Sequence, residues 1–478
     1  MNNQGNGAFP RSQGEAPLPA ADSSATPAAG DQYVTYRPVQ SSRPGVVEEI
    51  KEALDSGKAA DLTRSIVSGL EGVAQAGMPS PVRRFQGAVS RFFHNARLLF
   101  LTGVVIALAL LVVFTSAPDA LSAVLRQDPA SMTFPFAQLV ALRAFMVVGF
   151  GVLLILCLFF AVWRTFTTRS GGFLWAMALV CALGVVMHLS AVRSAGVDAK
   201  GQLAPDSGWS FTHQSGAVTV LVLNLDGRAA LSREVIAWAT ETGADVIVLP
   251  ESTPAIAAEV AGALTSVAQK NLGENKLPEF SEEVLATPGV LKATGAYSLF
   301  TAAGSDLVPD GHEPSPTDAL PRGSSTSVLV ATSLGPYVVE KELGTANGSV
   351  LLKPLEGGRP SILALHAGAP KRGYMSQWRA DLAQVSDICA ERTRTHLVVA
   401  GTLNATRDHA TVASSQCGLV MQSLGMGAVG TWPAVVPALL GAPIDGAMVG
   451  PGVLPVAGAV IDVKYTDHRA VAMRFEFQ

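Results

Sequence analysis

Charged residues are scarce in this chain: Asp, Glu, Lys and Arg make up only 15% of its 478 residues, while 49% are hydrophobic. A mean hydropathy of +0.33 at so low a charge is unusual for a purely soluble protein. The N-terminal region lacks a basic segment followed by an apolar stretch, which argues against a cleaved signal peptide. Together these features predict membrane-spanning segments within the chain.

Cysteines and cations are also few, and their placement excludes several protein classes. The chain has four cysteines, and no Cys/His spacing is typical of a zinc site. Cys389 and Cys417 lie in the second half of the chain, where an oxidising compartment would favour their pairing. Residues 200–478 carry 19 Lys and Arg against 26 Asp and Glu. This acidic part is poorly suited to nucleic acid, which is gripped by neutralising its phosphates.

Three apolar runs cover residues 98–116, 144–163 and 172–192. Each has about the 20 residues that a helix needs to cross ~30 Å of hydrocarbon. Cations flank them unevenly: four arginines precede the first run and two lie between the second and third, whereas the loop between the first and second holds only Arg126, with Arg143 at the edge of the second run. The positive-inside rule then places the N-terminus in the cytoplasm of a bacterial cell. Everything after the third run falls outside the inner membrane.

Two polar residues mark the apolar runs. Arg143 precedes the second run, where its side chain can reach the membrane interface. His188 lies inside the third run, and we interpret it as a hydrogen-bonding residue between helices. No second ionisable residue lies deep in any run, which argues against a transporter.

The chain divides into five segments. Residues 1–44 are rich in Ala, Pro, Gly, Ser and Gln and are predicted to be a disordered cytoplasmic tail. Residues 45–96 have aliphatic positions at helical spacing, which is typical of a cytoplasmic amphipathic helical segment; a solvated helix is favoured over a membrane-surface or partner-binding one. The three spans occupy residues 97–193, a linker covers 194–215, and an extracytoplasmic domain covers 216–478.

The last segment alternates short aliphatic strands with amphipathic helices. Strands are predicted within residues 217–226, 244–251, 326–333, 361–368, 396–405 and 470–477, and helices at 232–242 and 374–392. This alternation indicates an α/β domain, and polar residues follow the strands where such sheets usually build their sites. Residues 303–325 are predicted to form a surface loop on that side.

Five motifs and one further segment carry these polar residues: "NLDG" with Asn224 and Asp226, "VLPE" with Glu251, "LALHAGAP" with His366, "AGTLNAT" with Thr402 and Asn404, "APIDGAMVG" with Asp445, and "YTDHRAV" with Asp467 and His468. In this order they resemble the endonuclease/exonuclease/phosphatase superfamily over roughly residues 215–478. The resemblance extends to membrane-anchored members from actinobacteria, in which a few spans precede this domain.

The resemblance implies a fold, a cofactor and a set of roles. The fold would be a four-layer α/β sandwich, two packed mixed β-sheets flanked by helices. The cofactor would be Mg²⁺ (or Mn²⁺), whose preference for oxygen ligands suits such a site. The implied metal ligands are Glu251, Asn224, Asp226 and Asp467, and the implied catalytic residues are His468, Asp445, His366, Asn404 and Thr402. Each position also has a structural explanation: Asn-x-Asp-Gly is common in turns, and Glu251 precedes a helix start.

The sequence departs from the family pattern at Thr402, which stands where the family has the Asp that activates water. A threonine hydroxyl cannot take a proton as a carboxylate does. Two hypotheses follow. Either the domain is a phosphoesterase with impaired or altered catalysis, assisted by Asp408 or His409, or it is a non-catalytic pseudoenzyme that binds a phosphorylated ligand or an envelope protein. Gly446 also replaces a common His, beside Asp445 rather than at a reacting atom.

The expected partners follow from charge and location. The lipid bilayer is one partner, and the substrate is a small phosphoester, a lipid headgroup or an envelope phosphodiester, with nucleic acid less suited. Lys371 and Arg372 follow His366 and are placed either to contact a phosphate or to lie in a solvated loop.

Overall fold

The structure is a computed structural model that describes residues 80–125, 128–168, 171–197, 203, 216–272, 276–312 and 323–478. The predicted tail, the predicted cytoplasmic segment up to residue 79 and most of the predicted linker lie outside this range. The chain separates into two units, residues 1–92 and 93–478. The account below concerns the second unit and the helix that leads into it.

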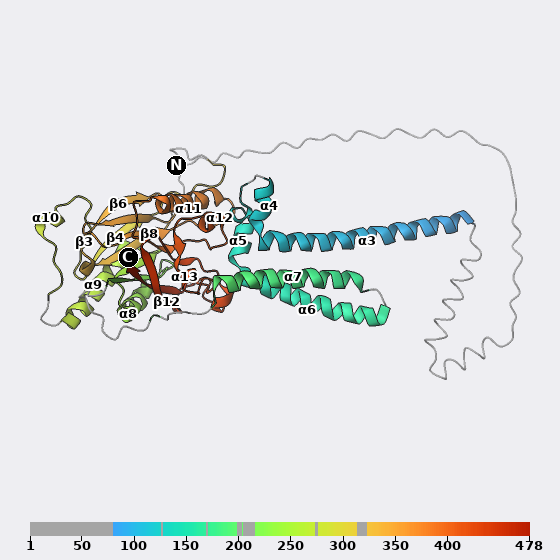
Figure 1. Cartoon of the computed structure of the whole chain (residues 1–478), viewed down its shortest axis with the longest axis horizontal. Helices are drawn as coiled ribbons and strands as arrows, with labels where there is room; N and C mark the ends of the chain where they lie inside the picture. The colour runs from blue at the N-terminus through green and yellow to red at the C-terminus, as the bar shows by residue number, and fades with distance from the viewer. Residues whose placement is uncertain are drawn as a thin grey trace, which may run out of the picture. The chain divides into compact units, whose positions relative to one another are not determined.

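Among the described residues, three helices are long and apolar enough to cross a membrane: α3 (Ser80–Ser116), α6 (Arg143–Thr168) and α7 (Gly172–Ala195). This confirms the three predicted apolar helices. α6 and α7 pack along each other, as Figure 1 shows. The segment between α3 and α6 holds α4 (Pro118–Leu125), η1 (Ala130–Met132) and α5 (Phe136–Ala141). α3 ends two residues before Pro118, because proline cannot donate to the continuing helical ladder.

His188 links two of these helices. Its Nε2 lies 3.0 Å from Oγ1 of Thr115 at the end of α3, and both residues are buried. Its ring also stacks on Phe150 of α6, with 5.6 Å between centroids. A hydrogen bond between helices, as predicted, therefore accounts for this polar side chain.

The strands of the structure form two mixed sheets. One contains β1 (Ala217–Val222), β2 (Val246–Pro250), β3 (Lys292–Ala293), β4 (Tyr297–Ala303), β5 (Ser325–Ala331), β12 (Val453–Ile461) and β13 (Ala470–Phe477), in the order β12-β13-β1-β2-β5-β4-β3. The other contains β6 (Tyr337–Leu343), β7 (Ser349–Pro354), β8 (Ser361–His366), β9 (Leu397–Thr402), β10 (Gly418–Leu419) and β11 (Asp445–Val449), in the order β10-β11-β9-β8-β7-β6. β1 pairs with β2, and β8 with β9, in parallel; the other pairs are antiparallel.

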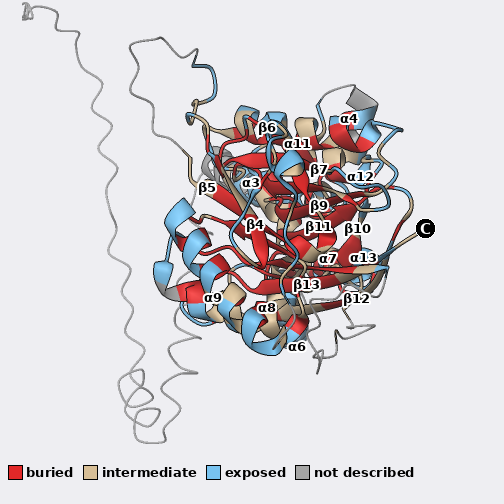
Figure 2. Cartoon of the chain, turned by 90° about the vertical axis from the view of Figure 1, so that its left-hand side faces the viewer, coloured by how far each residue is buried: buried red, intermediate tan, exposed pale blue. Residues whose placement is uncertain are grey.

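Alternation of side chains along the strands explains the layers. In β1, Val218 and Val220 enter a core shared by both sheets, whereas Leu221 faces the opposite side. The outer face of the first sheet is covered by α8 (Ser232–Thr242) and α9 (Pro254–Leu272), and that of the second by α11 (Met375–Ala390). Figure 2 shows the buried residues concentrated in the strands between these helices. The four-layer α/β sandwich is thus confirmed.

Short elements complete the domain: η2 (Ala229–Leu231), α10 (Glu282–Leu285), η3 (Thr332–Leu334), α12 (Ala410–Ala413), α13 (Val420–Ser423) and η4 (Ala438–Leu440). α8 has the predicted bounds, and it ends where Gly243 adopts a left-handed φ of 62° that few other residues tolerate.

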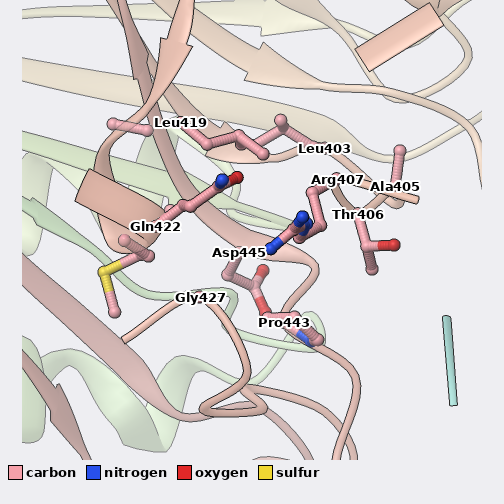
Figure 3. Close-up of a pocket in the computed structure, with 12 residues that line it drawn as sticks. Leu403, Ala405, Thr406, Arg407, Leu419, Gln422, Gly427, Pro443 and Asp445 are labelled. Atoms are coloured by element: carbon pink, nitrogen blue, oxygen red, sulfur yellow. The ribbon is translucent and has the colours of Figure 1, made fainter. Parts of the chain in front are cut away.

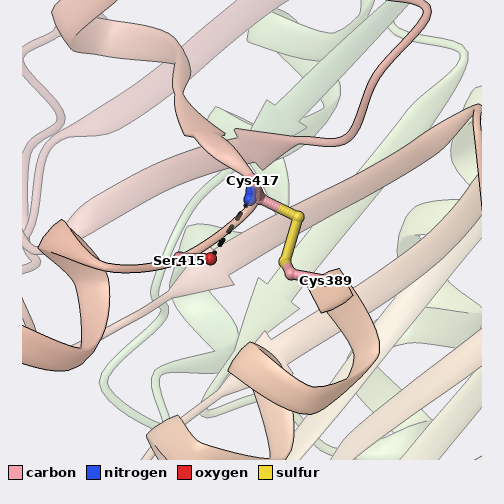
Figure 4. Close-up of a disulfide and its surroundings, with 3 residues drawn as sticks. All are labelled: Cys389, Ser415 and Cys417. Carbon is pink, nitrogen blue, oxygen red and sulfur yellow. Dashed lines mark hydrogen bonds between the residues drawn. A yellow bond between two sulfur atoms is a disulfide. The ribbon is translucent and has the colours of Figure 1, made fainter. Parts of the chain in front are cut away.

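A disulfide joins Cys389, in the last turn of α11, to Cys417 just before β10 (Figure 4). The Cα atoms are 5.4 Å apart, and the backbone N–H of Cys417 donates to Oγ of Ser415 at 3.2 Å. This is the predicted pair. Cys157 and Cys181 are free and buried on α6 and α7.

Candidate active site

The predicted site residues gather at one edge of the sandwich. Asn224 and Glu251 follow β1 and β2, His366 and Thr402 end β8 and β9, Asp445 begins β11, and His468 precedes β13. The edges of both sheets meet there, because His468 from the first sheet lies 2.8 Å from Asp445 of the second. Parallel strands and the starts of their antiparallel neighbours therefore bring residues more than 200 positions apart into one place.

Asp445 is the centre of a buried hydrogen-bonded group. Its Oδ2 lies 2.8 Å from Nδ1 of His468, and its Oδ1 accepts a 2.6 Å hydrogen bond from Oγ1 of Thr402. Burial lowers the pKa of His468, but the charge and hydrogen bond of Asp445, together with the charges of Asp467 and Glu251, raise that pKa above its usual value. Burial raises the pKa of Asp445, and the charge and hydrogen bond of His468, together with the hydrogen bonds of Thr402 and Thr431, bring the net pKa below its usual value. The pair therefore favours an imidazolium held by a carboxylate.

Glu251 faces a second group of polar side chains. Nδ2 of Asn224 donates to Oε1 of Glu251 at 3.2 Å, and Nε2 of His366 lies 3.9 Å from the same oxygen. Nδ2 of Asn347, in the turn between β6 and β7, lies 3.2 Å from Nε2 of His366. Burial lowers the pKa of His366 to about 3, so its ring is neutral at pH 7. The edge thus holds one imidazole whose pKa is raised, His468, and one that is neutral at pH 7, His366.

Backbone strain is concentrated at this edge. Among the described residues, the non-glycine positions with positive φ are Asp226 (48°), Glu251 (55°), Asn404 (50°) and Tyr465 (68°). All four lie in the turns that carry or adjoin the site residues. Left-handed conformations cost free energy in residues with a Cβ, and they cluster at functional sites. This strain is independent of the motifs and points to the same edge.

Two of the predicted metal ligands have other partners. Oδ2 of Asp226 pairs with the Arg228 guanidinium at 2.8 Å, and Oδ2 of Asp467 accepts from Nε1 of Trp432 at 2.9 Å. Oδ1 of Asp467 lies 3.8 Å from Nε2 of His468. Within the described ranges, no group of three or more His, Cys, Asp or Glu side chains is arranged to hold a metal ion. Asn224 turns Nδ2 toward Glu251, and its Oδ1 accepts from the backbone N–H of Asp226 at 2.9 Å. The predicted ligands that stand together are therefore the carboxylate of Glu251 and, after rotation of the amide, Oδ1 of Asn224.

The family assignment rests on residues 221–468. This stretch matches the family model described as "Endonuclease/Exonuclease/phosphatase family", and it covers more than half of the chain, including every site residue above. The chain belongs to the endonuclease/exonuclease/phosphatase family. No curated protein matches the chain.

Three solved structures are similar to about half of the chain at low identity. Humanized TDP2 from D. rerio is 15% identical, with 55% of this chain and 100% of that chain covered and a TM-score of 0.33. An endonuclease/exonuclease/phosphatase family protein from Bacteroides thetaiotaomicron is 12% identical, with 56% and 100% covered and a TM-score of 0.36. A mannosyl-6-phosphatase from the same species, strain VPI-5482, is 11% identical, with 54% and 100% covered and a TM-score of 0.35.

Within the endonuclease/exonuclease/phosphatase domain, Thr402 stands at the position where the sequence departs from the family pattern. Its hydroxyl is buried and donates to Asp445, and the two residues lie opposite each other where β9 pairs with β11. The neighbouring Asn404 donates from Nδ2 to the carbonyl of Ala367 at 2.9 Å, and its own carbonyl accepts from Nε1 of Trp378 at 3.1 Å. Thr402 therefore supports Asp445 and offers no carboxylate to activate water.

A narrow pocket opens beside Asp445 on the side of Gly446 (Figure 3). Its walls come from three regions: the segment after β9, the β10–α13 segment and the start of β11. The lining residues are Leu403, Ala405, Thr406, Arg407, Leu419, Met421, Gln422, Gly427, Pro443, Asp445, Gly446 and Ala447. Gly446 has a φ of 154°, which residues with a Cβ rarely adopt, and a Cβ there would make ordinary contact with Cγ of Met421 at 3.4 Å.

Asp408 and His409, the predicted assistants of catalysis, instead join the domain to the membrane helices. The carboxylate of Asp408 forms two hydrogen bonds with the guanidinium of Arg143, at 2.7 and 2.8 Å. His409 is fully buried, and its Nε2 lies 3.0 Å from the carbonyl of Ala137 in α5. Both side chains are committed to this junction. Arg143 likewise has its guanidinium paired within the protein.

Two further residues, outside the predicted site residues, lie at this edge. Asn347 lies in an Asn-Gly turn, which reads as an ordinary hairpin turn until its contact with His366 is known. Trp432 belongs to an apolar stretch and donates to Asp467. Of the predicted cations near His366, Arg372 lies over the ring of Phe134 at 5.9 Å from its centroid.

Proposed function

We propose that the chain is a membrane-anchored phosphoesterase whose site acts outside the cytoplasm with impaired catalysis. The observation that supports this most is the buried Asp445–His468 pair, which stands beside Glu251 and His366 at the strained edge of a family-type sandwich. A buried imidazolium next to a neutral imidazole suits the binding of a phosphoryl anion.

In this proposal Glu251 and Asn224 would hold Mg²⁺ or Mn²⁺, with water and substrate oxygens completing the shell. This donor set fits magnesium, which is often bound through one or two carboxylates plus substrate phosphates. When bound, the metal would neutralise charge on the phosphoryl oxygens. Asp226 and Asp467, engaged by Arg228 and Trp432, would act as outer partners of the site.

The protein residues then have separate tasks. His468, held by Asp445, would donate from Nε2 to a phosphoryl oxygen. Asn404 and His366 would fix the orientation of the phosphoryl group. Water attacks phosphorus as the ester P–O bond breaks, and the leaving oxygen takes up a proton. Because Thr402 is a hydrogen-bond donor to Asp445, the proton lost by water passes to solvent or to the phosphoryl group. Loss of a general base costs about 10²–10⁴-fold in rate, so turnover would be slow.

The direct test uses the full chain in detergent with bis-p-nitrophenyl phosphate and Mg²⁺ or Mn²⁺. Hydrolysis should be abolished by EDTA and reduced about 10²-fold or more in His468→Ala. His396→Ala is the matched control, because this half-exposed histidine precedes β9 at the opposite end of the strand from Thr402. Phosphate binding with no turnover in the wild type would instead support the alternative function, a non-catalytic domain that binds a phosphorylated ligand or envelope partner.

The proposed placement is a bacterial inner membrane with the N-terminus inside. The uneven cations around the apolar helices support it. So does the Cys389–Cys417 disulfide, since disulfides persist mainly in oxidising compartments. Protease added to intact spheroplasts should digest the domain of residues 216–478; digestion only after the cells are broken would reverse the orientation. An acidic domain in this location favours a small phosphoester, a lipid headgroup or an envelope phosphodiester over nucleic acid.

A further inference from the structure

The segment between α13 and β11 contains an apolar loop, residues 432–440, with the sequence WPAVVPALL. It has no charged side chain, and its large side chains face solvent: Val435 is 89% exposed, Leu439 48% and Trp432 37%. Exposed apolar groups this close together on a domain surface usually mark an interaction site. The apolar loop is therefore expected to contact a partner.

The loop is held in shape by a buried arginine. Arg469 is 4% exposed, and its guanidinium donates to the carbonyls of Ala434 at 3.0 Å and Val436 at 2.6 Å, with longer bonds to Gly430 and Pro433. A buried cation with several carbonyl acceptors fixes the backbone while leaving the apolar side chains outside. Their exposure is thus built into the domain.

The same loop is tied directly to the proposed site. Nε1 of Trp432 donates to Oδ2 of Asp467 at 2.9 Å, and the backbone N–H of Ala434 donates to the carbonyl of Asp467 at 2.7 Å. Asp467 and Arg469 flank His468 in the sequence. Whatever contacts the loop is therefore brought next to His468.

The loop also lies at the end of the membrane helices. η4, which forms its second half, packs against α6. Gly441 and Pro443 line a pocket with Arg143 and Ala144 at the start of α6 and with Ala195 at the end of α7. The backbone N–H groups of Gly427 and Ala428 donate to the carbonyls at the end of α7. Because these helix ends mark the border of the hydrocarbon region, the apolar loop lies at the level of the lipid headgroups.

We propose that the apolar loop inserts into the outer leaflet of the bilayer that holds α3, α6 and α7, and that the substrate is a phosphoester carried on a lipid in that leaflet. The substrate half of this proposal rests on the proposed function; the membrane contact does not. A tryptophan at the interface with aliphatic residues beyond it is the pattern expected for such an element. Lipid phosphates at that depth lie beside the loop that carries His468.

The membrane contact is tested with the full chain in vesicles of phosphatidylethanolamine and phosphatidylglycerol. Val435→Cys carries an environment-sensitive fluorophore, and Leu285→Cys, exposed on α10, is the matched control. The label at position 435 should shift to shorter wavelength and be quenched by brominated lipids, and the label at 285 should do neither. A label at 435 that stays water-exposed would overturn the proposal. The proposal would also be overturned if the emission shift increased with the amount of protein per vesicle and brominated lipids did not quench the label. That result would show that a second copy of the chain covers the loop.

The substrate class is tested with two esters that share a leaving group: bis-p-nitrophenyl phosphate in solution and an alkyl p-nitrophenyl phosphodiester embedded in the vesicles. Val435→Asp/Leu439→Asp should lower the ratio of kcat/KM on the embedded ester to that on the soluble ester by about tenfold or more, since two apolar anchors are lost. An unchanged ratio would overturn the lipid substrate. If neither ester is hydrolysed by the wild type, the proposed function and the lipid substrate fail, while the fluorescence result still decides the membrane contact.

Discussion

The ion pair between Arg143 and Asp408 allows the junction between the membrane helices and the domain to be tested quantitatively. Arg143 is the first residue of α6, and Asp408 lies four residues after Asn404. Nε and Nη2 contact the two carboxylate oxygens at 2.7 and 2.8 Å, and Nη1 donates to the carbonyls of Thr115 and Ser116 at 3.2 Å. Side-chain exposure is 11% for Arg143 and 19% for Asp408.

The expected costs follow from what each substitution leaves behind. Arg143→Met strands the Asp408 carboxylate and two carbonyls, which should lower the free energy of unfolding by about 3–5 kcal/mol. Asp408→Leu leaves Arg143 its two carbonyl acceptors, so the loss should be smaller, about 2–3 kcal/mol. The double variant removes both charges together. It should cost about as much as Asp408→Leu alone, which gives a coupling free energy equal to the Arg143→Met loss, about 3–5 kcal/mol.

The assay is chemical denaturation of the full chain in detergent, followed by tryptophan fluorescence. Arg233→Met, on the exposed side of α8, controls for loss of an arginine and should change the free energy of unfolding by less than about 0.5 kcal/mol. Single losses below about 1 kcal/mol that add in the double variant would refute the reasoning. In that case the bidentate geometry would carry no net stabilisation.

Three further predictions concern the domain itself. Replacing Cys389 and Cys417 by Ser opens a loop with a sequence separation of 28, and chemical denaturation should show that the free energy of unfolding falls by about 3–4 kcal/mol. A wild-type free energy of unfolding that is the same with and without reductant would contradict this prediction. Burial lowers the pKa of His366 to about 3, below its unfolded value near 6.5. Between these pH values the unfolded chain binds more protons than the folded one, so the free energy of unfolding should fall as pH falls from about 6.5 to 3. The loss should be about 2 kcal/mol at pH 5. His366→Gln should flatten this pH dependence, and an unchanged slope would mean that another group causes it. Thr402→Asp should raise the rate of hydrolysis about 10²-fold at some loss of stability, because it adds a base opposite Asp445. Thr402→Asn, the control, should leave the rate unchanged. Equal rates in the two variants would exclude a missing base as the cause of slow turnover.

The buried part of the fold could be predicted from the sequence because its strands read as continuous aliphatic runs. β1, β2 and β9 lie between covered faces and contain almost only apolar residues, which distinguishes them from the helices around them. The sequence patterns did not predict β3, β4, β6, β7, β10, β11 and β12. Of these, β6 and β12 carry exposed residues along their length, as Lys341 and Leu454 show, so their patterns lack a continuous run.

The site could be located because each of its residues adjoins the end or start of a recognisable strand. What the sequence could not supply was the partner of each side chain. Asp226 reads as a metal ligand until Arg228 is seen beside it, and Asn347 reads as a turn until His366 is seen beside it. These contacts depend on which strand ends meet, and that is decided by the packing of two sheets rather than by any local pattern.

The junction was hidden for the same reason, and its position has a consequence for the site. Asp408 and His409 bind Arg143 and Ala137, about 270 residues earlier in the chain, so no local signal distinguishes them from solvated or catalytic residues. The segment that carries them begins directly after Asn404. Because Asn404 is itself fixed by Trp378 and Ala367, a shift of the domain on the membrane helices would strain the site at Asn404. The ion pair should therefore hold the site, as well as the domain, at one height above the bilayer, as a lipid-borne substrate would require.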